Sequence, residues 1–229
     1  MNYDYIKRNL SCLTEEISEL SKKYSENDVT LVSVTKSATD DEVVALCRYG
    51  ADNIGENRPQ MLAAREELLR SAGITPTLHA IGTIQRNKAK IVVSRAALVH
   101  SLDSMKLAEA LNREAATLGI RLPVLIEINS ASEESKGGIL PNDAEAFLLD
   151  AMKLSSLAIS GIMTMGPVCE CAEDIRPYFR QTKKLYDKFN SRYGFEGGGI
   201  LSMGMSDSYR IAIEEGSTLV RVGRRLFIK

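Results

Sequence analysis

The chain has 229 residues, and its 29 lysines and arginines nearly balance its 30 aspartates and glutamates, for a formal net charge of −1 at pH 7. This balance argues against a nucleic-acid binder, which usually carries a basic excess. No apolar run approaches the ~18 residues that mark a transmembrane helix, and the acid-containing N-terminal segment does not resemble a signal peptide. Four cysteines, two of them in a Cys-x-Cys pair, and only two histidines do not make a zinc set. We therefore expect a cytoplasmic protein with reduced thiols, no metal, and no membrane or nucleic-acid partner.

The first predicted element is an amphipathic helix, whose apolar residues recur at spacings of three and four: Ile6, Leu10, Leu13, Ile17, Leu20 and Tyr24. After it, short runs of valine, isoleucine and leucine alternate with amphipathic stretches that end at glycine. The predicted strands cover residues 31–34, 51–54, 78–81, 97–100, 124–128, 157–163, 200–203 and 218–222. The predicted helix starts include a capping box from Thr39 to Glu42, a cap at Asn142 and a cap at Ser206.

Strands that are joined by helices run parallel and are buried on both faces, which fits unbroken apolar runs such as VLIEI at 124–128. Eight such units predict an α/β fold, a single (β/α)8 TIM-type barrel domain over residues 1–229 with an extra N-terminal helix. That helix either plugs or flanks the barrel. The alternative is a doubly wound open sheet, whose dinucleotide-binding form has GxGxxG after the first strand, where this chain has Thr35-Lys36-Ser37.

Functional residues of such a barrel lie in the loops that follow the strands. Lys36 follows the first strand, where an apolar wall would desolvate its ammonium and favour the neutral amine, a nucleophile for an aldehyde. A solvated loop lysine is the alternative interpretation. Arg221 lies inside the last strand, where a charge indicates either a structural ion pair or a functional site. His79, also inside a strand, is interpreted as a core histidine whose hydrogen bonds are satisfied.

The loops after the seventh and eighth strands are candidates for binding phosphate, as in many barrels of this class. Gly204 would allow a close backbone approach, Ser206 could donate its hydroxyl to an anion, and the eighth strand ends at Gly223. Ser206 could also simply cap the helix that follows it. Met163 and Met203 would flank the mouth, where packing is the default role of methionine.

Six segments resemble the pyridoxal phosphate homeostasis protein family, whose fold is similar to the barrel domain of alanine racemase. They are LVSVTK (31–36), GADNIGEN (50–57), LHAIGTIQRNKAK (78–90), SKGGI (135–139), GIMTMGP (161–167) and LSMGMSDSYRIAIEEGSTLVRVG (201–223). The resemblance implies pyridoxal phosphate (PLP) as cofactor. It also implies a set of binding residues: Lys36 as the Schiff-base lysine, Ser206, Gly223 and the backbone of Arg224 for the phosphate, Arg221 facing the pyridine nitrogen, Asn57 near the ring, and Met163 and Met203 lining the pocket.

The implied position of Arg221 has a chemical consequence. A guanidinium only donates hydrogen bonds and stays charged, so it disfavours a pyridinium and weakens the cofactor as an electron sink. The sequence also departs from the family pattern. Arg224 and Arg225 follow Gly223 where the family carries a threonine, Thr83 stands where a histidine is frequent, and Arg58-Pro59 follows GEN. The Arg224 side chain would either supply a cation to the phosphate or point to solvent.

The resemblance implies a monomeric PLP carrier or regulator with little or no catalysis, which acts in intracellular PLP homeostasis and hands the cofactor to apo-enzymes. The alternative is a PLP-dependent amino-acid racemase. It would need a second base, which in alanine racemase is a tyrosine of another domain and subunit, and we expect no such domain because the sequence ends at its eighth strand. A Schiff-base aldolase would need acid–base partners around Lys36, and carboxylates near the mouth, such as Glu56, are few.

Overall fold

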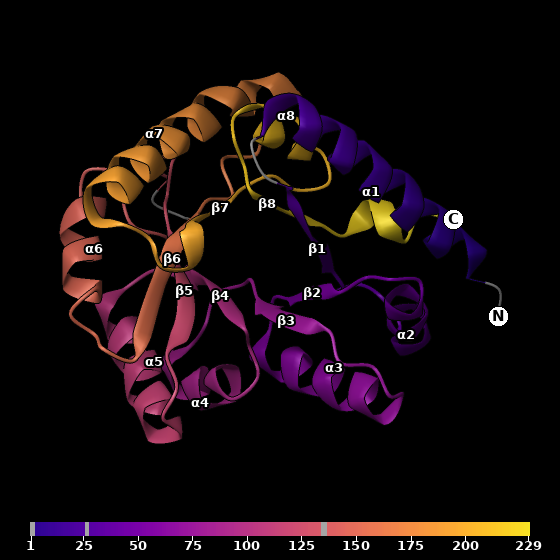
Figure 1. The fold of residues 1–229 in the computed structure, drawn as a ribbon, viewed down its shortest axis with the longest axis horizontal. Coiled ribbons are helices and arrows are strands. Elements are labelled where there is room, and N and C mark those ends of the chain that lie inside the picture. Colours follow the sequence, from indigo (N-terminus) through magenta and orange to yellow (C-terminus); the bar gives the residue numbers. More distant parts are fainter. Residues whose placement is uncertain (1–2, 26–27, 134–136) are drawn as a thin grey trace.

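The computed structural model describes residues 3–25, 28–133 and 137–229 of the chain. Its strands are parallel and follow one another in chain order around a closed barrel, with β1 next to β8 (Figure 1). The strands are β1 (Thr30–Val34), β2 (Asn53–Glu56), β3 (Thr77–Ala80), β4 (Leu98–Leu102), β5 (Leu122–Glu127), β6 (Leu157–Met163), β7 (Ile200–Ser202) and β8 (Leu219–Val222). The predicted (β/α)8 barrel is confirmed.

Helices form a ring outside the strands (Figure 1). They are α1 (Asp4–Tyr24), α2 (Asp40–Arg48), α3 (Pro59–Ser71), α4 (Ala89–Val93), α5 (Met105–Leu118), α6 (Ala144–Ala151), α7 (Arg176–Tyr193) and α8 (Tyr209–Glu214), with short 3₁₀ turns η1 (Arg86–Lys88), η2 (Ala172–Ile175), η3 (Glu196–Gly198) and η4 (Arg224–Leu226). The extra helix α1 packs against α2, α8 and η4. It therefore flanks the barrel and does not plug it.

Local signals located some helix ends and missed others. The capping box is present, because the Thr39 hydroxyl accepts from the Glu42 amide while the Glu42 carboxylate accepts from the Thr39 amide. The predicted cap at Asn142 is wrong, since α6 begins at Ala144 without a side-chain cap. Ser206 does not cap α8 either, because that helix begins only at Tyr209.

The barrel interior holds its own apolar cluster, separate from the larger core between strands and helices. It is built from Val32, Leu98, Leu125, Met163 and Leu219, which come from five different strands. Residues of that many strands can meet only inside the cylinder, so the barrel is a packed core and no pore. Successive side chains of a strand point to opposite faces, so every second residue from an inward-facing one also faces inward. We apply the same alternation to the first residues that follow each strand at the mouth.

Three further properties of the described ranges bear on the expectations from composition. No helix in residues 3–25, 28–133 or 137–229 combines the length and apolar character needed to cross a membrane. The four cysteines carry free thiols. Within the same ranges, no three His, Cys, Asp or Glu side chains group closely enough to hold a metal ion.

Candidate ligand site at the barrel mouth

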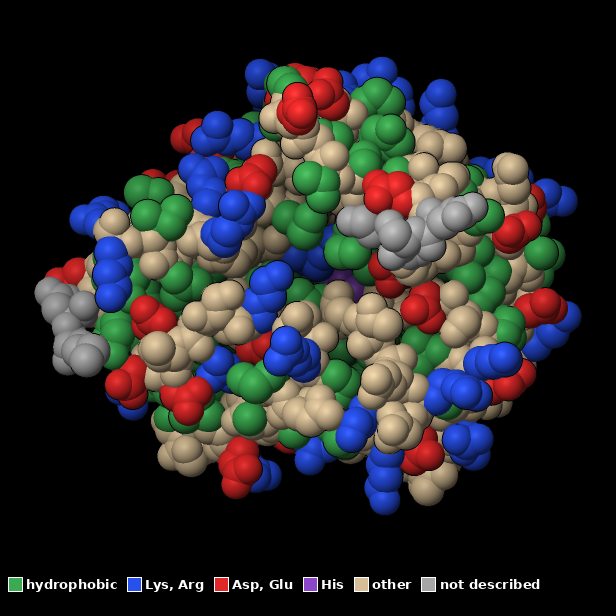
Figure 2. Space-filling view, turned by 180° about the vertical axis from the view of Figure 1, so that it is seen from behind, with side chains coloured by type: hydrophobic (Ala, Val, Ile, Leu, Met, Phe, Trp, Pro, Cys, Tyr) green, Lys and Arg blue, Asp and Glu red, His purple; other side chains and the backbone are tan. Residues whose placement is uncertain are grey.

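Closure of the barrel brings the first and last strands together. Val32 pairs in register with Arg221, and Ser33 pairs with Val222. Two residues past Arg221, the backbone of Gly223 lies close to Val34. Lys36 is two residues beyond Val34, so it shares a rim with the end of β8. Figure 2 shows one face of the molecule hollowed at its centre, with lysine or arginine and histidine side chains at the floor.

Lys36 lies in the turn that follows β1, with the same parity as the inward-facing Val32. Its side chain is exposed. The expectation that an apolar wall desolvates the amine is therefore wrong, because the loop after β1 presents the side chain to solvent. What the fold provides is an amine that a small molecule can reach.

The turn that carries Lys36 is held from below by a buried ion pair. Arg65 donates from Nε to Glu56 Oε1 at 3.1 Å, and both residues are buried. On one side of Lys36, the Thr35 hydroxyl donates to the same Glu56 oxygen at 2.6 Å. On the other side, Arg65 Nη2 donates to the Ala38 carbonyl at 2.8 Å. Glu56 thus braces the turn and is not a free acid at the mouth.

Arg221 lies inside the barrel near the mouth and is only 3% exposed. Its guanidinium donates from Nη1 to Ser202 Oγ at 2.5 Å and from Nη2 to the Thr164 carbonyl at 3.1 Å. Burial lowers the pKa of Arg221 to about 10, against the opposing effect of the Glu127 charge, so the group stays cationic at neutral pH. Its hydrogen-bond partners are neutral oxygens, which favours the functional-site interpretation over the structural ion pair.

The interpretation of His79 as a core histidine whose hydrogen bonds are satisfied is confirmed. It is 4% exposed, and its two ring nitrogens lie 3.0 Å from Asn53 Oδ1 and 3.0 Å from His100 Nε2. Burial lowers the pKa of His79 to about 4 and holds the pKa of His100 well below its ordinary value. No local pattern in the sequence pairs the two histidines, because they are 21 positions apart.

The loop after β7 carries Gly204 and Ser206, which the sequence analysis named as candidates for binding phosphate. Since α8 starts at Tyr209, the Ser206 hydroxyl is not used as a cap, and it accepts from the Gly223 amide at 3.4 Å. A Cβ on Gly204, whose φ is +92°, would come 2.5 Å from the Ala212 Cβ. Glycine at this position therefore lets the loop pack onto α8.

The side chain of Arg224 was expected either to supply a cation to the phosphate or to point to solvent. Its side chain is 74% exposed and forms an ion pair with Asp207, which is equally exposed. The guanidinium therefore lies at the outer rim. The backbone of Arg224 starts the 3₁₀ turn η4 directly after β8, where the first amides of a helical turn have no partner within the turn.

Three further predicted site residues, Asn57, Met163 and Met203, lie in different parts of the barrel. Asn57 follows β2 and is half-buried, with Gly82 packed so tightly on it that a Cβ would lie 2.3 Å from the Asn57 carbonyl oxygen. Met163 belongs to the interior cluster. The prediction that Met203 lines the pocket is wrong: strand alternation directs Ser202 inward, and Met203 is fully buried in the core between strands and helices.

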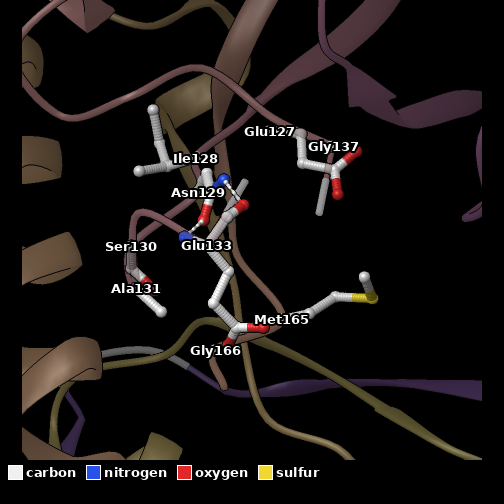
Figure 3. A pocket seen from close by; sticks show the side chains of 9 residues that line it. All are labelled: Glu127, Ile128, Asn129, Ser130, Ala131, Glu133, Gly137, Met165 and Gly166. Carbon is white, nitrogen blue, oxygen red and sulfur yellow. Dashed lines mark hydrogen bonds between the residues drawn. The ribbon is translucent and has the colours of Figure 1, made fainter. Parts of the chain in front are cut away.

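Glu127 is a residue of the mouth that the sequence analysis missed. With Asn129, Glu133, Met165 and other residues that follow β5 and β6, it lines a small pocket of about 20 Å³ (Figure 3). Burial, and then the charge of Asp103, raises the pKa of Glu127 to about 7, while Arg221 opposes the shift. The available signal was an acid at an inward position of an otherwise apolar strand.

One neighbouring segment is described only in part. Asn129 donates to the Glu133 carbonyl oxygen at 2.9 Å and accepts from the Glu133 amide at 3.2 Å, which closes the start of the loop after β5 (Figure 3). The SKGGI segment (135–139) follows, and its first two residues lie outside the described residues. A Cβ on Gly138, whose φ is +104°, would come 2.9 Å from the Asn129 amide, so this part of the motif lies directly against the end of β5.

The family described as alanine racemase, N-terminal domain, matches residues 8–228. The pyridoxal phosphate homeostasis protein of Aquifex aeolicus (strain VF5) is 34% identical over 220 residues, 95% of each chain. This chain belongs to the pyridoxal phosphate homeostasis protein family. PipY of Synechococcus elongatus PCC7942, solved with PLP bound, has a TM-score of 0.84 and 28% identity over 97% of this chain and 100% of that one. Alanine racemase of Clostridium difficile 630 has a TM-score of 0.74 at 20% identity over 99% of this chain and 56% of that one, which is a likeness of fold.

The donor set of this member of the pyridoxal phosphate homeostasis protein family fits an aldehyde that carries a phosphate. The primary amine of Lys36 follows β1, the buried cation of Arg221 lies in β8, and the Ser206 hydroxyl follows β7. These three strands are neighbours in the closed barrel. Amine, cation and hydroxyl therefore face one mouth from adjacent strands.

Proposed function

We propose that this protein binds PLP at the barrel mouth through Lys36 and acts in PLP homeostasis as a carrier or regulator with little catalysis of its own. The observation that carries the proposal is the closure of β7, β8 and β1, which gathers Lys36, Arg221 and Ser206 at one end of the cylinder. The name of the Aquifex relative and the PLP bound to PipY support the choice of ligand.

Each residue has a defined task in this proposal. When bound, PLP supplies an aldehyde that condenses reversibly with a primary amine, and Lys36 carries an exposed amine at this mouth. The Ser206 hydroxyl and the backbone at Gly223 and Arg224 bind the phosphate. Arg221 faces the ring nitrogen from inside the barrel, with Asn57 and Met163 beside the ring.

The chemistry of Arg221 supports binding over catalysis. The guanidinium is a pure hydrogen-bond donor and is cationic at neutral pH, so it opposes protonation of a ring nitrogen beside it. A ring nitrogen without a proton withdraws electrons poorly from a carbanion. The exposed amine of Lys36 suits reversible loading and release, and we therefore propose apo-enzymes that require PLP as the recipients. We also propose that the chain works as a monomer, because these residues all come from one chain.

Reductive trapping tests the proposal. The protein is incubated with excess PLP, reduced with borohydride and examined by peptide mass spectrometry. We expect one stoichiometric adduct on Lys36, which Lys36→Ala abolishes. Lys184→Ala is the matched control, because Lys184 is an exposed lysine on the outer helix α7, and it should keep the adduct. An adduct spread over other lysines, or none at all, would contradict the proposal.

The limited catalysis is tested separately. The PLP-loaded protein is incubated with a single enantiomer of alanine, and the product is analysed on a chiral column. We expect conversion far slower than about 1 per second, the lower end of ordinary enzyme turnover. Turnover at or above that rate would instead favour the racemase.

A further inference from the structure

A line of hydrogen-bonded side chains crosses the barrel interior and ends at Arg221. Asn53 Oδ1 lies 3.0 Å from His79 Nε2, and His79 Nδ1 lies 3.0 Å from His100 Nε2. His100 Nδ1 lies 3.0 Å from Ser202 Oγ, which accepts from Arg221 Nη1 at 2.5 Å. The line uses residues of β2, β3, β4, β7 and β8, and both histidines and Ser202 are buried.

Only one direction of donation satisfies every bond in this line. Arg221 has no acceptor, so Ser202 Oγ must accept from it. At the other end, Asn53 Oδ1 accepts, so His79 carries its proton on Nε2 and accepts at Nδ1. His100, also neutral, then donates from Nε2 to His79 and accepts at Nδ1, which leaves the Ser202 proton as the donor to His100.

We propose that His100 and His79 are positioning residues for Arg221. By taking the one proton of Ser202, His100 turns the lone pairs of that oxygen toward the guanidinium. Without an acceptor at His100 Nδ1, the serine hydroxyl is free to rotate its proton toward Arg221, where two donors would face each other. The guanidinium would then lose one of its two anchors. That this anchoring serves a bound ring rests on the proposed function.

The energetics argue against a packing role for the two imidazoles. Another layer of the same interior is filled by apolar side chains, so the barrel has no general need for polar ones. The depressed pKa values of both histidines show that the interior disfavours their charged forms. A buried polar ring is retained at this cost when its hydrogen bonds serve a partner, and this line ends on a buried cation.

The tautomers provide a test that needs no cofactor. The chain contains only two histidines, so a long-range ¹H–¹⁵N imidazole spectrum of the apo-protein shows two ring systems. We expect both rings as the neutral tautomer with the proton on Nε2, from pH 7 down to about pH 5. The proposal is overturned if either ring carries its proton on Nδ1, or if either titrates near the ordinary histidine value of about 6.5.

A matched pair of variants tests the positioning of Arg221. His100→Asn keeps a carbonyl oxygen near the place of Nδ1 and can still accept the Ser202 proton, whereas His100→Leu cannot. We expect the apo-protein guanidinium signal of Arg221, assigned by its loss in Arg221→Lys, to stay sharp in His100→Asn and to broaden in His100→Leu. Equal spectra in the two variants would overturn the proposal.

Cofactor affinity extends the test to the site. An absorbance titration with PLP should show about tenfold weaker binding or more for His100→Leu and Ser202→Ala, the effect of losing a hydrogen bond to a charged group. His100→Asn should bind close to wild type. Ser160→Ala is the control, because Ser160 is a buried serine of β6 whose hydroxyl donates to the Ala158 carbonyl oxygen of its own strand.

The two proposals fail in different ways. If the wild-type protein takes up no PLP while the tautomers and the Arg221 signal behave as expected, the proposed function falls and the positioning line stands. If PLP is trapped on Lys36 while His100→Leu binds it like wild type, the positioning proposal falls and the proposed function stands.

Discussion

Gly223 is packed against Val34: a Cβ on Gly223 would lie 2.9 Å from the Val34 carbonyl oxygen and 3.2 Å from its Cβ. This contact is made across the seam where β8 meets β1. It lets the chain leaving β8 pass close to the turn that carries Lys36. The end of the last strand and the loop of the first strand thereby share one rim, although 187 positions separate Lys36 and Gly223 along the chain.

Substituting this glycine tests the seam. Gly223→Ala should lower the free energy of unfolding by about 1–3 kcal/mol, because the Val34 backbone oxygen at the end of β1 cannot easily move away from the added methyl group. PLP binding should weaken as well. The control is Gly137→Ala, where the nearest atom to the new Cβ is an Asp103 oxygen at 3.7 Å. Urea unfolding compares the stabilities of the two variants, and an absorbance titration measures PLP binding. Equal stabilities would show that the seam can relax.

The buried pair of Arg65 and Glu56 makes a second prediction. Arg65→Met leaves the Glu56 carboxylate buried without its cation, which should cost about 3–5 kcal/mol of unfolding free energy. The double variant Arg65→Met, Glu56→Gln should recover much of that loss, because no charge then stays buried. Arg121→Ala is the control, since Arg121 pairs with Glu196 at a site where both side chains are about half exposed; it should cost under about 1 kcal/mol.

The same variant should disturb Lys36. Arg65 and Glu56 hold Thr35 and Ala38 on either side of it. We expect the borohydride-trapped fraction in Arg65→Met to fall even at temperatures where circular dichroism shows the variant fully folded. Trapping at the wild-type level would show that the turn does not need this brace.

Glu127 should make stability depend on pH. Its folded pKa of about 7 lies above the ordinary value of 4.5, so the folded state binds more protons between these limits and stability falls as pH rises through them. Glu127→Gln removes this loss. The variant should match the wild type best near pH 4, and gain on the order of 3 kcal/mol at most above pH 7, at about 1.4 kcal/mol per pKa unit. Urea unfolding at several pH values measures the difference, and a constant difference would contradict the assignment.

His79 should act in the opposite direction. Its folded pKa of about 4 lies below the ordinary 6.5, so the unfolded state binds more protons between these values and stability is lost as pH falls from 6.5 toward 4. In the wild type this loss partly cancels the gain from Glu127. We expect the acid loss to be largest in Glu127→Gln and smaller in His79→Gln. Thermal unfolding at pH 7 and pH 4.5 distinguishes them; equal acid losses would count against a neutral buried His79.

The order of the elements was predictable because it depends on local patterns. Apolar runs, glycine stops and the Thr39 capping box are read over a few residues, and parallel strands joined by helices leave few topologies. Boundaries were less certain. The second strand was predicted at 51–54 and runs from Asn53 to Glu56, because a short apolar segment does not mark where backbone pairing begins.

For the candidate site, the sequence located the loops better than it predicted the directions of individual side chains. Lys36, Ser206 and Gly223 follow strands, and the rule that barrel sites lie at strand ends places them together. The family resemblance assigned Met203 to the pocket, but alternation along β7 directs Ser202 into the barrel interior and Met203 into the core between strands and helices.

By itself, the order of apolar and polar residues determined the barrel, the presence of an extra N-terminal helix and the loops that carry the mouth, since each depends on neighbours within one or two turns of chain. Only the tertiary structure decided which polar side chains meet across the cylinder. Asn53, His79, His100, Ser202 and Arg221 come from five strands, and closure alone places them within hydrogen-bonding distance. A hydrogen bond depends on distance in space, and barrel closure makes that distance independent of separation along the chain.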